Sequence, residues 1–141
     1  MLKGSEILFR LILSVVLSGI IGLERELSKK EAGLRTHMLV CIGSTLIMLT
    51  SIYVFDIYRD IATVDPSRIA ASVITGIGFL GAGTILRFGH DVRGLTTAAC
   101  LWVTAAVGLA VGCGFYFASI LTSLFTLVIL LFFARLEQKI K

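Results

Sequence analysis

Long runs of apolar residues, separated by short charged segments, constrain this chain more than any other feature. The runs cover residues 7–23, 36–58, 69–86, 98–112 and 115–134. A helix needs about 20 apolar residues to cross the hydrocarbon core of a bilayer, and most of the runs are close to that length. In lipid the backbone polar groups must be paired within the chain, and a helix pairs them locally. The sequence therefore predicts an all-α membrane bundle of about five transmembrane helices.

The composition excludes a soluble protein. Of the 141 residues 57% are hydrophobic and only 16% are charged, whereas soluble domains carry about 25% charged residues. We therefore expect one membrane domain, residues 1–141, with no water-soluble domain. The net charge of +4 comes from basic residues at the ends of apolar runs. Such residues contact lipid headgroups and set topology, so we expect the bilayer and not a nucleic acid as partner.

The basic residues are distributed unevenly between the two sides of a five-span bundle. One side receives Arg25, Lys29, Lys30, Arg35, Arg87, Arg93, Arg135, Lys139 and Lys141. The other receives Lys3, Arg10, Arg59 and Arg68. Because excess positive charge marks the cytoplasmic face, we expect the amino terminus outside and the carboxyl terminus inside.

Small residues recur at spacings that allow helices to approach closely. The candidate packing residues are Ser14, Ser18, Gly22, Gly76, Gly78, Gly81, Ala82, Gly83, Gly108 and Gly112. Because the run 69–86 is rich in small residues, we expect it to pack against neighbours on most sides. The small-residue faces of the first and fourth helices also predict a homodimer, with Ser14, Ser18, Gly22, Gly108 and Gly112 as its contacts.

The string 76–81 also fits the dinucleotide fingerprint G-x-G-x-x-G. That motif requires a preceding strand and an acidic residue about 20 positions later, and neither is present here. We interpret the glycines as packing residues. The alternative is a broken helix whose free backbone groups line a site, as in transporters.

No pattern in the sequence indicates catalysis, a metal or a cofactor. Cys41, Cys100 and Cys113 lie in apolar runs without CxxC or CxxH spacing, so we expect small buried residues. His37 and His90 lie at helix ends. No nucleophile, base and orienting group recur at a recognisable spacing, so we expect a non-enzymatic protein.

Charged and hydroxyl residues at the ends of the runs form a second pattern. We expect a functional polar cluster of Glu24, Arg25, Arg35, Arg93 and Thr97 at the cytoplasmic ends of the first, second and fourth helices, closed over by the third. The wider candidate set adds Thr36, Arg68, Asp91 and Thr96. Arginine pairs bidentately with carboxylate or phosphate, so such a cluster suits an acidic or phosphate-bearing partner.

Four strings, GLERE at 22–26, AGLRT at 32–36, GIGFLGAG at 76–83 and VRGLTTAA at 92–99, resemble the MgtC/SapB family of bacterial inner-membrane proteins. The resemblance runs from about residue 19 to 112. It implies a multi-pass plasma-membrane protein associated with growth in low magnesium and, in pathogens, with virulence. Many members carry a soluble ACT-type domain after the membrane part, and roles that depend on that domain are not carried over to this chain.

Two functions of different class remain open. The first is a regulator that binds another membrane protein, and the resemblance implies the F-type ATP synthase as one such partner. The second is an ion carrier or channel, with Mg²⁺ as the candidate ion. No Asp or Glu lies in the middle of an apolar run, whereas ion pathways usually contain intramembrane ionisable residues. This absence favours the regulator.

Overall fold

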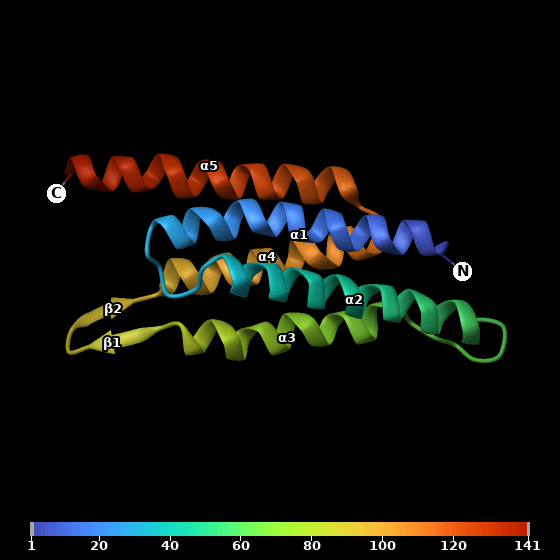
Figure 1. The fold of residues 1–141 in the computed structure, drawn as a ribbon. Coiled ribbons are helices and arrows are strands. Elements are labelled where there is room, and N and C mark those ends of the chain that lie inside the picture. The colour runs from blue at the N-terminus through green and yellow to red at the C-terminus, as the bar shows by residue number, and fades with distance from the viewer. Residues whose placement is uncertain (1, 141) are drawn as a thin grey trace.

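A computed structural model describes residues 2–140, apart from the side chains of residues 135 and 137–140. Within that range the chain forms five helices and one β-hairpin (Figure 1). The elements are α1 (Gly4–Leu27), α2 (Leu34–Tyr58), α3 (Ser67–Gly83), β1 (Leu86–Phe88), β2 (Asp91–Arg93), α4 (Leu95–Cys113) and α5 (Tyr116–Ile140).

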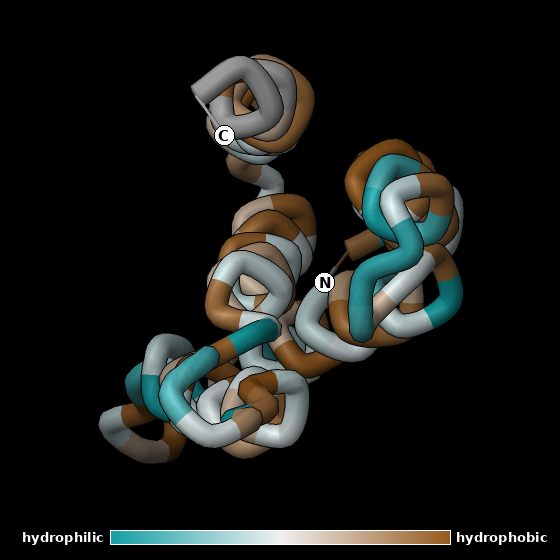
Figure 2. Tube along the Cα trace, turned by 90° about the vertical axis from the view of Figure 1, so that its left-hand side faces the viewer, coloured by the Kyte–Doolittle hydropathy of each residue, from teal (hydrophilic) through white to brown (hydrophobic). Residues whose placement is uncertain are grey.

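The predicted helical membrane bundle is confirmed. Four segments are long and apolar enough to cross a membrane: α1, α2, α4 and residues 116–134 of α5. The remaining helix, α3, has 17 residues and is shorter than these. Hydrophobic segments lie on the outside of the bundle as well as inside it (Figure 2). This distribution is expected where lipid replaces water as the solvent.

The expectation of helices alone omitted the hairpin. The third run was expected to stay helical to residue 86, but α3 ends at Gly83 and Leu86 pairs antiparallel with Arg93. The turn contains Gly89 at φ +63°, a left-handed conformation that glycine adopts without strain. The hairpin therefore occupies the segment that the sequence suggested was a simple loop.

The most tightly packed part of the bundle lies where α2 and α4 meet. A methyl group on Gly108 would overlap the carbonyl oxygen of Cys41, and one on Gly112 would lie 2.6 Å from Cβ of Met48. Thr45 donates a hydrogen bond of 2.9 Å to the carbonyl oxygen of Gly108. The absence of side chains on these two glycines therefore lets the helix backbones come close enough for a direct hydrogen bond between helices.

Helix α3 lies at the edge of the bundle. It buries a single stripe, Ala70, Val73, Ile77 and Gly81, and contacts α2 and α4. The rest of its surface is open, and Phe79 is 83% exposed. The expectation that this helix packs on most sides was wrong. We inferred burial from the many small residues of this helix. Lipid is as apolar as a protein interior, however, so a surface of small residues can face lipid and does not have to be buried.

The loops fall at two ends of the bundle. The 28–33 loop, the hairpin and the carboxyl end of α5 lie at one end, and the amino end of α1 and the 59–66 loop lie at the other (Figure 1). The segments with the excess of basic residues thus share an end. Which side of a membrane this end faces stays a prediction.

Candidate functional site

Arg25 is the centre of the polar group at the hairpin end of the bundle. It lies in the last turn of α1 and is only 4% exposed. A methyl group on the neighbouring Gly22 would lie 2.9 Å from Cα of Leu34 and 3.0 Å from Cβ of His37. Because Gly22 has no side chain, α2 packs directly on this turn of α1.

Three segments meet at this arginine. Its Nη2 donates a hydrogen bond of 3.2 Å to Oγ1 of Thr97, in the first turn of α4. Thr97 in turn donates one of 2.6 Å to Oε2 of Glu31, in the loop between α1 and α2. The carboxylate of Glu24 lies 3.6 Å from Nη1 of Arg25. The Thr97 hydroxyl therefore joins a cation and an anion that do not pair directly.

Several polar atoms around Arg25 are left without a hydrogen bond. Nε of Arg25, Oε2 of Glu24 and Nε2 of His37 are buried and have no hydrogen-bond partner among the described residues. Nδ1 of His37 lies 2.9 Å from the carbonyl oxygen of Gly33, and because a carbonyl only accepts, Nδ1 is the donor. Buried polar groups are nearly always paired in folded proteins, so unpaired ones mark a place where a further ligand or water is expected.

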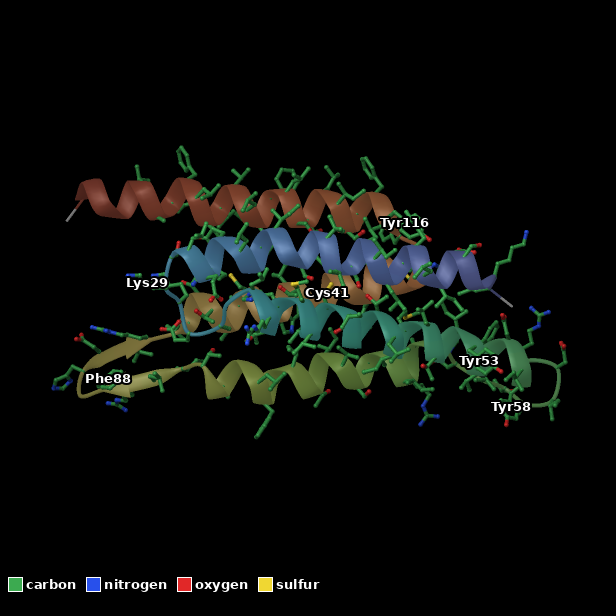
Figure 3. The ribbon with its side chains drawn as sticks, in the orientation of Figure 1. Lys29, Cys41, Tyr53, Tyr58, Phe88 and Tyr116 are labelled. Carbon is green, nitrogen blue, oxygen red and sulfur yellow. The ribbon has the colours of Figure 1, made fainter. Side chains whose placement is uncertain are left out.

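A cleft of about 520 Å³ opens beside Arg25. Its lining comes from the end of α1, the following loop, β2 and the start of α4: Arg25, Lys29, Lys30, Glu31, Val92, Arg93, Gly94, Leu95, Thr96 and Thr97. Lys29 and Phe88 mark this end of the molecule, whereas Tyr116 lies toward the other (Figure 3). We call this the basic cleft.

A second hollow, of about 230 Å³, adjoins the basic cleft and shares Arg25, Lys30 and Thr96 with it. Its remaining lining is the apolar face of α5: Ile129, Leu130, Phe133 and Ala134. We call this the apolar hollow. A polar surface and an apolar surface thus meet along three shared residues.

The basic cleft has a strongly positive lining. Four of its residues are cationic, Arg25, Lys29, Lys30 and Arg93, and one, Glu31, is anionic. Within the described part of the chain, Lys29, Lys30 and Arg93 form no ion pair. The hydrogen bond from Thr97 lowers the pKa of Glu31, so its carboxylate is charged at neutral pH.

The start of α4 adds partial positive charge to the same cleft. Gly94 precedes the helix at φ 87°, and no side chain of the described residues caps the first turn. A methyl group at Gly94 would overlap the carbonyl oxygen of Thr84, so both its conformation and its surroundings require glycine. The uncapped N–H groups of this turn carry the positive end of the helix dipole.

The predicted polar cluster is only partly assembled. Glu24, Arg25 and Thr97 come together, and Arg93 and Thr96 line the basic cleft with them. Arg35 and Thr36 are exposed, and Arg35 makes no hydrogen bond or ion pair with any described residue. Arg35 lies two positions before the buried His37, which places it on the opposite face of α2.

Two other members of the set lie elsewhere. Arg68 is exposed in the first turn of α3, at the opposite end of the bundle, and Asp91 is exposed on the hairpin. The expectation that the third helix closes over the cluster was also wrong, because the hairpin and the start of α4 form that wall. The functional role of the cluster stays a prediction.

Sequence reasoning missed three residues. Glu31 and His37 lie at the cluster but were not candidates, and Arg10 was interpreted only as a topology signal. Arg10 is 5% exposed, donates hydrogen bonds to the carbonyl oxygen of Gly112 at 2.6 Å and to the Tyr116 hydroxyl at 3.0 Å, and pairs with Glu6. Glu6 lies just before the first apolar run and Arg10 lies inside it, and their i, i+4 spacing was the signal that could have found this group.

The predicted packing residues divide into two sets. Gly22, Gly108 and Gly112 lie against another helix within van der Waals distance, and Gly81 lies against Ala98. Ser14 and Ser18 are buried, with their hydroxyls bonded to carbonyls of α1. A methyl group on Gly76, Gly78 or Gly83 would meet no atom of the described residues within 4 Å, and Ala82 is exposed.

This division corrects the expected dimer contacts. Ser14, Ser18, Gly22, Gly108 and Gly112 are all buried within one chain. They are therefore not available to a second copy.

Comparison with known proteins finds close relatives over most of the chain. The model of the MgtC family matches residues 11–139. "Putative magnesium transporter YhiD" of Escherichia coli K12 is 49% identical over 138 residues, which is 96% of this chain and 64% of that protein. "Protein SapB" of Bacillus subtilis is 41% identical over 139 residues, 96% of this chain and 60% of that protein. "Protein MgtC" of Salmonella typhimurium LT2 is 42% identical over 107 residues, 76% of this chain and 43% of that protein.

The chain spans less than two thirds of the length of these relatives. No solved structure matches it. The family model nevertheless covers nearly the whole chain, including every residue that lines the basic cleft. This protein belongs to the MgtC family.

Proposed function

We propose that the chain is the membrane part of a non-enzymatic regulator in the bacterial inner membrane, which binds a transmembrane helix of another membrane protein under magnesium limitation. The observation that carries this proposal is an unused row of small residues on α3: Ala71, Thr75, Gly78 and Ala82. They recur at intervals of three or four residues, so they lie on one helix face, and all four are exposed.

Elsewhere in this molecule, residues of the same kind are used for close helix contact. Gly108 and Gly112 bring α4 against α2, and both are fully covered. In a bilayer, where burial of apolar surface gives no driving force, small residues favour helix association by allowing backbones to approach. The open row on α3 therefore offers the same kind of contact to a helix from outside the chain.

The charge of the basic cleft supports regulation over magnesium transport. A lining of four cations and one carboxylate repels a divalent cation from this end of the bundle. Within the described residues, no group of three or more His, Cys, Asp or Glu side chains is placed to hold a metal ion. The name of the Escherichia coli relative nonetheless makes magnesium transport the second candidate.

A flux measurement separates the two candidates. The purified protein in liposomes should pass Mg²⁺ no faster than protein-free liposomes. Flux above that background would replace the regulator with a transporter.

The contact row is tested in cells that lack this protein and grow poorly in low magnesium. Gly78→Leu and Ala82→Leu should each reduce the restored growth while the protein level in the inner membrane stays normal. Val128→Leu, on the exposed face of α5, is the matched control and should restore growth fully. The F-type ATP synthase is the first partner to examine by co-purification, and a second copy of this chain is the other. Full growth with both α3 variants would contradict the proposal.

We also propose that the basic cleft faces the cytoplasm, because nine of the 13 basic residues fall on its side of the chain. Single cysteines at Lys29 and Asp60, in a background without Cys41, Cys100 and Cys113, report the orientation. An impermeant reagent applied to intact cells should label the cysteine at 60 and not the one at 29. The reverse pattern would invert the topology.

A further inference from the structure

We propose that the basic cleft is a binding site for a phosphate group. Four features converge there: a buried arginine with unused bonding capacity, the amino end of α4, three cations with no acidic partner among the described residues, and one internal carboxylate that an incoming anion would displace. The proposal does not rest on the regulatory function, because it concerns a different surface from the α3 row.

Arg25 supplies the fixed charge. It is 4% exposed and lines the cleft, its Nε has no hydrogen-bond partner among the described residues, and its contact with Glu24 is 3.6 Å long. A buried guanidinium that is only partly neutralised attracts an anion strongly, and its planar set of donors matches the oxygens of a phosphate.

The first turn of α4 supplies backbone donors. The cleft is lined by Gly94, Leu95, Thr96 and Thr97. The N-cap residue, Gly94, has no side chain with which to cap the first N–H groups of the helix. The free N–H groups at the start of a 19-residue helix form a recognised binding place for phosphate. Arg25 and this turn are already joined through the Thr97 hydroxyl, so both sets of donors are held by the same contact.

In this structure the carboxylate of Glu31 lies in the basic cleft, at the position where we expect the phosphate to bind. Its carboxylate accepts the hydrogen bond of Thr97 at the mouth of the helix dipole. Lys29, Lys30 and Arg93 surround the same cleft and have no acidic partner among the described residues. A phosphate carries more charge than a carboxylate, so it should displace Glu31 and pair with these cations.

The phosphate can come from an anionic lipid headgroup or from free phosphate. The apolar hollow continues directly from the basic cleft through Arg25, Lys30 and Thr96, and α5 supplies its apolar wall. A headgroup in the cleft would leave its acyl chains beside Leu130 and Phe133. This continuity favours the lipid, and the two sources are separated by experiment.

The experiment measures binding to the purified full chain in neutral detergent. The probes are phosphatidic acid, diacylglycerol with the same acyl chains, and inorganic phosphate, each followed by native mass spectrometry or equilibrium dialysis. Phosphatidic acid should bind and diacylglycerol should not. Binding of phosphatidic acid alone identifies a lipid headgroup, and equal retention of inorganic phosphate identifies a free anion.

Matched variants locate the site. Arg93→Gln and Arg25→Gln should each weaken binding about tenfold or more, as expected for loss of a charge-assisted contact. Glu31→Gln should strengthen binding several-fold because it removes the competing carboxylate. Arg35→Gln removes the same charge from the same end of the bundle but outside the cleft, and should leave binding unchanged.

Three results would overturn the proposal. They are failure of both phosphate probes to bind, an equal loss in Arg35→Gln and Arg93→Gln, and weaker binding by Glu31→Gln. Arg93 is exposed on the hairpin, so its variant remains informative if Arg25→Gln does not fold.

Discussion

Helix α1 carries two buried arginines, one near each end, and they are bonded very differently. Arg10 donates to the Gly112 carbonyl and the Tyr116 hydroxyl, pairs with Glu6, and lies 5.8 Å from the centre of the Tyr116 ring. Among the described residues, Arg25 makes one hydrogen bond of 3.2 Å and one longer contact, and its Nε has no hydrogen-bond partner. Their burial is nearly the same, at 5% and 4% exposed.

The difference shows that burial alone does not indicate what an arginine does. Each of the three guanidinium nitrogens of Arg10 donates a hydrogen bond within the chain, and these bonds tie α1 to the end of α4 and the start of α5. Arg25 has capacity left, beside a cleft that is open to solvent. We therefore interpret Arg10 as a structural link and Arg25 as a binding group, and the following predictions test that contrast.

The largest effect on stability is expected at Arg10. Replacement by Leu leaves the Gly112 carbonyl and the Tyr116 hydroxyl unpaired, which should cost about 2–3 kcal/mol of unfolding free energy. Arg25→Leu should cost about half as much, because it removes fewer and longer contacts. Equilibrium unfolding in mixed detergent micelles measures both. If Arg25→Leu lost as much unfolding free energy as Arg10→Leu, or more, the distinction between a structural Arg10 and a binding Arg25 would be wrong.

The second effect extends the contrast to glycines. Gly108→Ala places a methyl group against the Cys41 carbonyl and should cost about 1–3 kcal/mol. Gly78→Ala meets no neighbour and should stabilise α3 by up to about 1 kcal/mol through helix propensity. The same unfolding assay applies. If both variants changed the unfolding free energy in the same direction, the packed face of α4 at Gly108 and the open face of α3 at Gly78 would not differ as the structure indicates.

The smallest effect is a pH dependence at the Arg25 end. The hydrogen bond from Thr97 lowers the pKa of Glu31 in the folded protein, so the contribution of Glu31 to stability is present above the unfolded pKa, near 4.5, and is lost as pH falls through the folded pKa. Glu31→Gln should flatten the unfolding free energy across this acid window, and Thr97→Val should do so partly. Arg35→Gln, at a side chain with no hydrogen bond or ion pair to any described residue, should leave the pH slope unchanged. If the unfolding free energies of the wild type and of Glu31→Gln had the same pH dependence, the hydrogen bond between Thr97 and Glu31 would not contribute to stability.

Much of the fold was predictable because lipid imposes a simple rule on length and hydropathy. Each of the five apolar runs contains or overlaps one helix, since a chain in lipid has to pair its own backbone. The hairpin was not predictable from hydropathy because its strands have three residues each, too few to show alternation. Its turn glycine, Gly89, was the available signal.

The candidate site was predictable in part, for reasons of helical phase. Arg25 and Thr97 were grouped correctly because both lie at helix ends on one side of the chain. Arg35 was included wrongly. It lies at the correct end of α2, but on the exposed face of the helix, away from the cluster. The side chain of Glu31, in a loop rich in lysine, could be placed only once the start of α4 was seen beside it.

The length of α3 has a consequence for the membrane itself. At 1.5 Å per residue its 17 residues rise about 25 Å, which is less than the roughly 30 Å of hydrocarbon in an average bilayer. The exposed apolar side chains of Ile85, Leu86 and Phe88 follow directly after it and extend the apolar surface toward the headgroups. Helix α2 beside it has 25 residues and needs no such extension. Lipids along the α3 face therefore meet a shorter helix than those along α2, and the apolar side chains after it make up part of the difference, so a thinner bilayer should favour the α3 face.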